Sequence, residues 1–157
     1  MKKIFLVALI ATTFIQQSFA QDSTKTQSSP LLASYYNLKD ALVSSNPTTA
    51  AASAEAFLKA LNDIDKETIK EEIRTALISD AGAISQATDL KIQREKFATL
   101  SGNMFALAKA VKLSAEPVYQ QYCPMKKASW LSNNKAIKNP YYGNAMLTCG
   151  SVKETIQ

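Results

Sequence analysis

Apolar residues recur at helical spacing from residue 31 to about residue 114, in four segments separated by short polar breaks. Positions three or four apart share one face of a helix, so this period predicts amphipathic helices rather than strands. We expect helices over about 31–45, 48–62, 65–84 and 88–111. Such helices joined by short turns bury their apolar faces together, which predicts an antiparallel four-helix bundle.

The breaks between these segments carry residues that commonly begin helices. Asn46, which is followed by proline, is expected to cap the second helix. Asp63 or Asp65 is expected to cap the third helix, and the fourth is expected to begin near Thr88 or Asp89. The caps therefore support the helix boundaries that the apolar period predicts.

The composition of the chain changes after Pro117. Tyrosines, the single tryptophan, prolines and both cysteines gather in this last part. The stretch 139–144 (NPYYGN) is typical of a turn, because proline fixes φ and glycine adopts a positive φ easily. We therefore predict an irregular, aromatic-rich C-terminal segment packed on the bundle, and the predicted fold class is all-α.

The first 20 residues have the pattern of a secretory signal. Lys2 and Lys3 precede an uncharged, mostly apolar run over 4–15, and Ser18 and Ala20 place small residues before a cleavage site. The run is shorter than the roughly 20 residues of a membrane span, so no stable span is expected after cleavage. We predict a signal peptide (1–20), a flexible leader (21–30) and one helical domain (31–157). The predicted location is periplasmic or secreted.

The residue counts exclude several functions. The 157 residues include no histidine and two cysteines, which excludes Ser-His-Asp and Cys-His catalysis, the usual catalytic zinc sites and zinc fingers. The formal charge is +5, and it becomes +3 once Lys2 and Lys3 leave with the signal, too little to indicate nucleic-acid binding. No nucleophile with a base, phosphate loop or carboxylate constellation is evident, so no enzyme activity is expected.

Each cysteine has a methionine close by in the sequence: Cys123 is followed by Met125, and Cys149 is preceded by Met146. Three interpretations compete. Export favours a structural disulfide, which closes a loop of about 26 residues and stabilises the fold by roughly 3.5 kcal/mol. Two thiolates and two thioethers instead form a ligand set that prefers a soft ion such as Cu(I). A redox-active pair is the third interpretation, although the spacing is not that of a Cys-x-x-Cys motif.

Other residues of this segment are candidates for packing or for docking. Trp130, Tyr141 and Tyr142 are expected to pack the segment onto the bundle, with ligand or partner docking as the alternative. Lys126 and Lys127 are expected to lie on a solvated face, and their alternative role is a docking patch for an acidic partner.

The chain resembles an exported bacterial domain of unknown function over about residues 31–153. The resemblance is carried by YCPM, WLS, NPYYGN and MLTCG in the C-terminal segment, and by YNLKDAL and QREKF in the helical part. In that family the domain stands alone or is fused to the periplasmic adaptor subunits of heavy-metal efflux pumps. The resemblance implies a link to copper or another heavy metal, with the two cysteines and their neighbouring methionines as the residues that matter.

The functional prediction is a periplasmic accessory protein that binds a soft, Cu(I)-type ion through Cys123, Met125, Met146 and Cys149. Its expected partner is a periplasmic efflux adaptor or another envelope protein. The alternative is an envelope protein-interaction module that is stapled by a Cys123–Cys149 disulfide and binds no metal.

Overall fold

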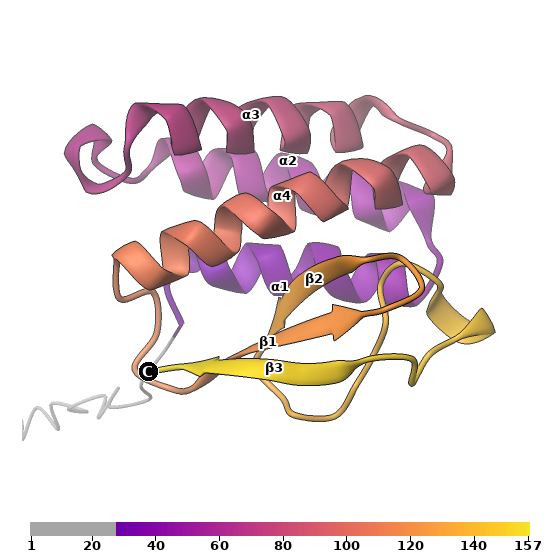
Figure 1. The fold of residues 1–157 in the computed structure, drawn as a ribbon. Coiled ribbons are helices and arrows are strands. Elements are labelled where there is room, and N and C mark those ends of the chain that lie inside the picture. Colours follow the sequence, from indigo (N-terminus) through magenta and orange to yellow (C-terminus); the bar gives the residue numbers. More distant parts are fainter. Residues whose placement is uncertain (1–27) are drawn as a thin grey trace, which may run out of the picture.

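Four helices form one layer and a small antiparallel sheet lies against them in the computed structural model, which describes residues 28–157 (Figure 1). The predicted signal peptide and most of the predicted leader lie outside the described residues. The helices are α1 (Pro30–Val43), α2 (Pro47–Asn62), α3 (Glu71–Gln86) and α4 (Leu90–Ala110), with a short 3-10 turn, η1 (Lys66–Thr68), before α3. The four predicted helices are thus confirmed, although α3 begins at Glu71 and not near residue 65.

The helix caps follow the sequence in two of three cases. Asn46 caps α2 by accepting the N–H of Thr49 at 3.0 Å, and Asp89 caps α4 by accepting the N–H of Lys91 at 2.7 Å. Asp65, in contrast, caps the short turn η1, and α3 begins only at Glu71. The expectation that Asp63 or Asp65 caps the third helix is therefore wrong.

The buried side chain of Arg74 explains the late start of α3. Its guanidinium donates to the carbonyls of Leu61, Ile64 and Asp65 at 2.8–3.0 Å. The carbonyls of Leu61 and Asp65 also accept the backbone N–H groups of Ile64 and Thr68, at 3.4 and 3.1 Å. Arg74 thus ties the end of α2 to the loop that follows it, and α3 begins beyond this loop.

The C-terminal part is a sheet and not an irregular segment, so the all-α prediction is wrong. The sheet has three antiparallel strands in the order β2-β1-β3: β1 (Val118–Cys123), β2 (Ala128–Ser132) and β3 (Ser151–Ile156). A 3-10 turn, η2 (Gly143–Ala145), lies between β2 and β3 in the chain. The register of β1 with β3 shifts between Gln120 and Gln121. Buried residues do not alternate regularly along β1 or β2, so the sequence pattern by which a half-buried strand is recognised is absent.

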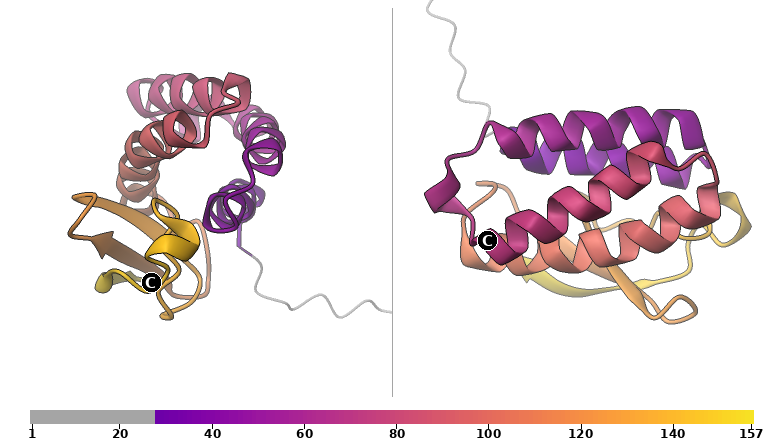
Figure 2. Two further views of the ribbon diagram at one scale, coloured as in Figure 1. Left: turned by 90° about the vertical axis from the view of Figure 1, so that its right-hand side faces the viewer. Right: turned by 90° about the horizontal axis from the view of Figure 1, so that it is seen from above.

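The sheet covers the region between the first and last helices. Each helix packs mainly on the next one along the chain, whereas α1 and α4 share few contacts and β2 packs on α4. Viewed along their axes, the four helices are arranged in an arc, and the sheet lies beside α1 and α4 (Figure 2). The strands therefore complete a core that the helices alone leave open.

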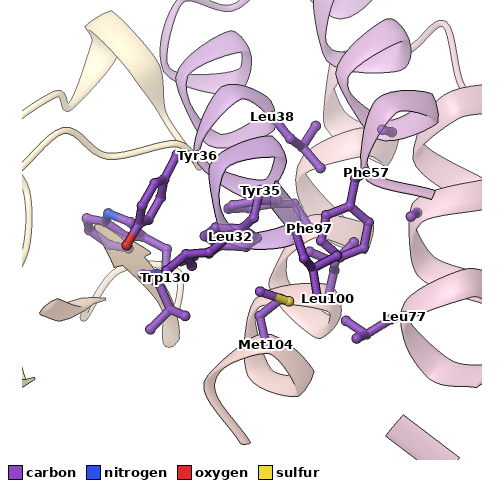
Figure 3. Packing of buried hydrophobic residues seen from close by; sticks show 14 of the residues in the cluster. Leu32, Tyr35, Tyr36, Leu38, Phe57, Leu77, Phe97, Leu100, Met104 and Trp130 are labelled. Carbon is purple, nitrogen blue, oxygen red and sulfur yellow. Dashed lines mark hydrogen bonds between the residues drawn. The ribbon is translucent and has the colours of Figure 1, made fainter. Parts of the chain in front are cut away.

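An aromatic cluster joins the two layers. Tyr35 of α1 stacks on Phe97 of α4 with ring centroids 5.4 Å apart, and Phe97 also contacts Tyr141 at 6.0 Å. The Tyr35 hydroxyl accepts the N–H of Leu131 in β2 at 3.0 Å and lies 2.7 Å from the hydroxyl oxygen of Ser101 in α4. Figure 3 shows Tyr35 and Phe97 within the buried cluster and Trp130 on its strand side.

None of the helices within residues 28–157 is long and apolar enough to cross a membrane.

Candidate functional site

The two cysteines lie next to each other on neighbouring parts of the sheet. Cys123 is the last residue of β1, and Cys149 precedes β3, the strand that pairs with β1. Their sulfur atoms are 3.9 Å apart, although 26 positions separate the residues in the sequence. Both are free thiols; Cys123 is buried, whereas Cys149 is partly exposed. The antiparallel pairing of β1 with β3 therefore brings the two thiols together, and solvent can reach the pair on the side of Cys149.

The hairpin loop after β1 places a hydrogen-bond donor against the sulfur of Cys123. The backbone N–H of Lys126 donates to this sulfur at 3.4 Å. Burial by itself raises the pKa of the Cys123 thiol, but the polar groups of Lys126, Asn139, Cys149 and Met125 around it lower that pKa below the ordinary value. Cys123 is thus suited to be a thiolate, the form that binds metals and attacks disulfides.

Cys149 has the opposite electrostatic character. Its pKa is raised, first by burial and then by its hydrogen bond to Cys123 and the negative charge that develops there. The pair therefore loses its first proton easily and its second with difficulty, as expected for two coupled groups. An ion that binds both sulfurs must displace the proton of Cys149.

Asn139 fixes the position of Cys149 from the opposite loop. This fully buried side chain donates to the carbonyl of Cys149 at 2.8 Å and accepts the N–H of Tyr141 at 2.9 Å. Its own backbone N–H donates to the carbonyl of Leu147 at 2.8 Å. One asparagine thus links both ends of the loop 139–149.

Gly150 lets the chain turn from Cys149 into β3. Its φ of +151° and its crowded surroundings both require glycine, since a Cβ there would lie 2.9 Å from the Trp130 ring and 2.9 Å from the carbonyl oxygen of Tyr122. The ring of Trp130 therefore packs against the backbone that carries the second thiol.

The two methionines lie on the loops that carry the cysteines. Met125 is 63% exposed, which is unusual for this apolar side chain, whereas Met146 is half-buried and the N–H of Cys149 donates to its carbonyl at 3.1 Å. Met104, in contrast, is fully buried in α4, as its helical position predicts. The structure thus brings the two cysteine sulfurs within 3.9 Å of each other and places a methionine on each of the loops that carry them.

The candidate docking residues divide into buried and surface groups. Trp130 and Tyr141 are buried, and their rings pack edge-on with centroids 5.8 Å apart. Lys127 is exposed and has a left-handed backbone conformation, with φ +55°, in the hairpin loop before β2. Tyr142 and Lys126 line a surface pocket together with residues of α4. The aromatic residues thus do the packing that their sequence context predicts, and the surface group stays available to a ligand.

Two residues that shape the site were not singled out for this role by sequence reasoning. Asn139 reads as part of a turn, and nothing in one sequence shows that its amide is buried. Arg94 donates to the carbonyls of Pro140 and Leu42 at 2.9 and 3.0 Å and to the Ser45 hydroxyl at 2.9 Å, which ties the C-terminal loop to the end of α1. Only its place within the QREKF motif points to it.

The geometry of the two thiols fits a shared ligand. With metal–sulfur bonds of about 2.3 Å, two sulfurs 3.9 Å apart subtend an angle of about 115–120° at the ion. No cluster of three or more histidine, cysteine or carboxylate side chains able to hold a metal occurs in residues 28–157. The thioethers of Met125 and Met146, on the loops beside the cysteines, are donors that a soft ion accepts and a hard ion does not.

Comparison with known proteins assigns the helical part of the chain to a family. Residues 31–116 match the model of a family described as a protein of unknown function (DUF3347). The match covers more than half of the chain and includes all four helices, while both cysteines and the three strands lie beyond it. No curated protein and no solved structure shows significant similarity.

Proposed function

The chain belongs to this family of unknown function, and we propose that it binds one soft metal ion of the Cu(I) type through the thiolates of Cys123 and Cys149. Met125 or Met146 supplies a thioether as the third ligand. The protein acts in this proposal as an exported accessory to heavy-metal efflux or homeostasis, and its partner is a periplasmic efflux adaptor or another envelope protein.

The observation that carries the proposal is the 3.9 Å approach of the two thiol sulfurs. This separation suits an ion with two or three sulfur ligands, and Cu(I) accepts such low coordination with soft ligands. A structural zinc site needs four ligands, and the neighbourhood of the pair supplies only two of the usual types. The geometry therefore favours Cu(I) over zinc.

The surroundings of Cys123 support metal binding as well. N–H donors stabilise a thiolate before any ion arrives, which lowers the competition from protons. The partial exposure of Cys149 and the exposure of Met125 give an incoming ion a path to the buried sulfur. An exposed methionine next to a thiol pair is well placed to capture a soft ion first and pass it inward.

Cu(I) uptake under reducing conditions, measured by competition with a chromophoric chelator, tests the proposal. We expect one ion per wild-type chain, none in Cys123→Ser/Cys149→Ser, and weaker binding in Met125→Leu or Met146→Leu. Met104→Leu is the matched control because Met104 is buried in the helical core, so its affinity should equal that of the wild type. Equal uptake by the double serine variant and the wild type contradicts the proposal.

The same proximity supports a second candidate function, an interaction module stapled by a Cys123–Cys149 disulfide. Intact mass of protein isolated from its native compartment without reductant separates the two. A deficit of about 2 Da without bound metal favours the disulfide, and a retained ion favours the metal.

A further inference from the structure

A pocket of about 210 Å³ opens on the surface where the N-terminal half of α4 meets the two C-terminal loops. Its walls combine three cationic side chains, one carboxylate and two phenol rings: Lys91, Arg94, Glu95, Lys126, Tyr141 and Tyr142. The volume lies below the roughly 300–1,000 Å³ of sites for drug-sized ligands. The pocket therefore suits one small chemical group.

The cations around this pocket are not neutralised by the protein. The ion pairs found within residues 28–157, Lys39–Asp40 and Lys109–Glu154, involve none of the pocket residues. The excess of three positive over one negative side chain gives the pocket a positive potential, and the start of α4 adds the positive end of a helix dipole nearby.

Hydrogen bonds to the protein hold the guanidinium of Arg94 on two of its three nitrogen atoms. Nε and Nη2 of Arg94 donate to the carbonyls of Pro140 and Leu42 and to the Ser45 hydroxyl, while Nη1 has no hydrogen-bond partner among the described residues. Gly143 permits this close packing, since a Cβ there would lie 2.8 Å from Nη2. A guanidinium fixed in this way loses little side-chain freedom when a ligand binds to it.

We propose that this pocket binds a carboxylate group. Glu95 in its wall disfavours a doubly charged phosphate, whereas a singly charged carboxylate can accept hydrogen bonds from Arg94 and Lys126 and stay clear of Glu95. The carboxylate belongs either to a small organic acid or to a glutamate or aspartate of a partner protein. This proposal needs no metal and does not depend on the thiol pair.

The test is a titration of the reduced, metal-free protein at constant ionic strength, followed by NMR shifts of backbone amides and the Arg94 Nε–H. One probe is acetate, and the other is a capped peptide with a single glutamate between glycines. We expect saturable shifts at Lys126 and Tyr142, and about tenfold weaker binding in Lys91→Gln/Lys126→Gln. The control Lys59→Gln/Lys96→Gln removes the same charge from exposed sites outside the pocket and should bind as the wild type does.

Each outcome bears on the proposal. Saturation by either probe with selective loss in the pocket variant supports it, and the tighter of the two probes identifies the source of the carboxylate. No saturable shift with either probe overturns it, and so does equal weakening in both double variants, which would indicate general screening of charge. Because no metal is present, failure here leaves the Cu(I) proposal standing.

Discussion

The Sγ atom of Cys123 lies 3.9 Å from that of Cys149, because Cys123 ends β1 and Cys149 leads into the strand paired with it. The two thiols have unequal pKa values, lowered at Cys123 and raised at Cys149. An unequal, adjacent pair can hold one soft ion or form one disulfide, and the following predictions distinguish these states.

Titration of the reduced, metal-free protein should show two separate thiolate steps. The first appears at lower pH than for an ordinary cysteine because donors to Cys123 outweigh its burial, and the second appears at higher pH. Cys149→Ala should raise the first pKa because it removes one donor. Ultraviolet absorbance of the thiolate measures both, and a single step at the pKa of a model peptide would count against the inferred environment.

Stability should follow the same shifts with opposite signs. The lowered pKa of Cys123 stabilises the fold above the pKa of the unfolded thiol, and this contribution is lost as pH falls through the folded pKa. The raised pKa of Cys149 stabilises the fold below the pKa of the unfolded thiol, and this contribution is lost as pH rises through the folded pKa. Urea unfolding of Cys149→Ala and Cys123→Ala, measured from below the folded pKa of Cys123 to above that of Cys149, separates the contributions of the two thiols to stability.

Mild oxidation should join Cys123 to Cys149 within one chain and abolish Cu(I) uptake. Both effects follow from the short distance between the sulfurs, since a disulfide consumes the thiolates that the ion needs. We expect a mass loss of about 2 Da and stabilisation of about 3.5 kcal/mol. Mass spectrometry with peptide mapping checks the bond. Predominant formation of disulfide-linked dimers would show that the sulfurs do not meet in solution.

Asn139→Ala should destabilise the fold by about 2–3 kcal/mol, because it leaves the Cys149 carbonyl and the Tyr141 N–H without partners in a buried place. Cu(I) affinity should fall with it, since Cys149 loses its anchor. Urea unfolding and chelator competition measure the two effects. Asn144→Ala in the exposed part of the same loop is the control and should change neither.

Gly150→Ala should destabilise the fold by about 3 kcal/mol, because the new Cβ meets the Trp130 ring and the Tyr122 carbonyl at a strained φ. Gly102→Ala is the matched control. Its helical site has no atom within 4 Å of the new Cβ, so it should stabilise the protein by about 0.5–1 kcal/mol. Thermal unfolding measures both, and equal effects would contradict the described packing around Cys149.

The helices could be predicted from the sequence because their cause is local. Apolar residues at helical spacing and caps such as Asn46 and Asp89 act within one or two turns of the chain. The sequence does not reveal the strands because none of them alternates regularly between buried and exposed positions: β2 buries three residues in succession, and β3 is mostly exposed. The sheet lies where α1 and α4 make few contacts with each other, and this arrangement of the helices is a property of the tertiary structure.

The candidate site was predictable in part for the same reason. Cys123 and Cys149 stand out as the two cysteines of a chain whose first residues predict export, so their approach could be expected. The roles of Asn139 and Arg94 depend on contacts with loops far away in the sequence, which no spacing reveals. The exposure of Met125 likewise appears only in the folded chain, whereas the burial of Met104 follows from its helical position.

X-ray absorption at the copper edge of the Cu(I)-loaded protein tests the central claim most directly. The account predicts a first shell of two or three sulfur atoms at about 2.2–2.3 Å and no nitrogen or oxygen ligand. Loss of one sulfur from the shell in Met125→Leu or in Met146→Leu would identify the thioether. A first shell dominated by nitrogen or oxygen atoms would contradict the proposal that Cys123 and Cys149 hold the ion.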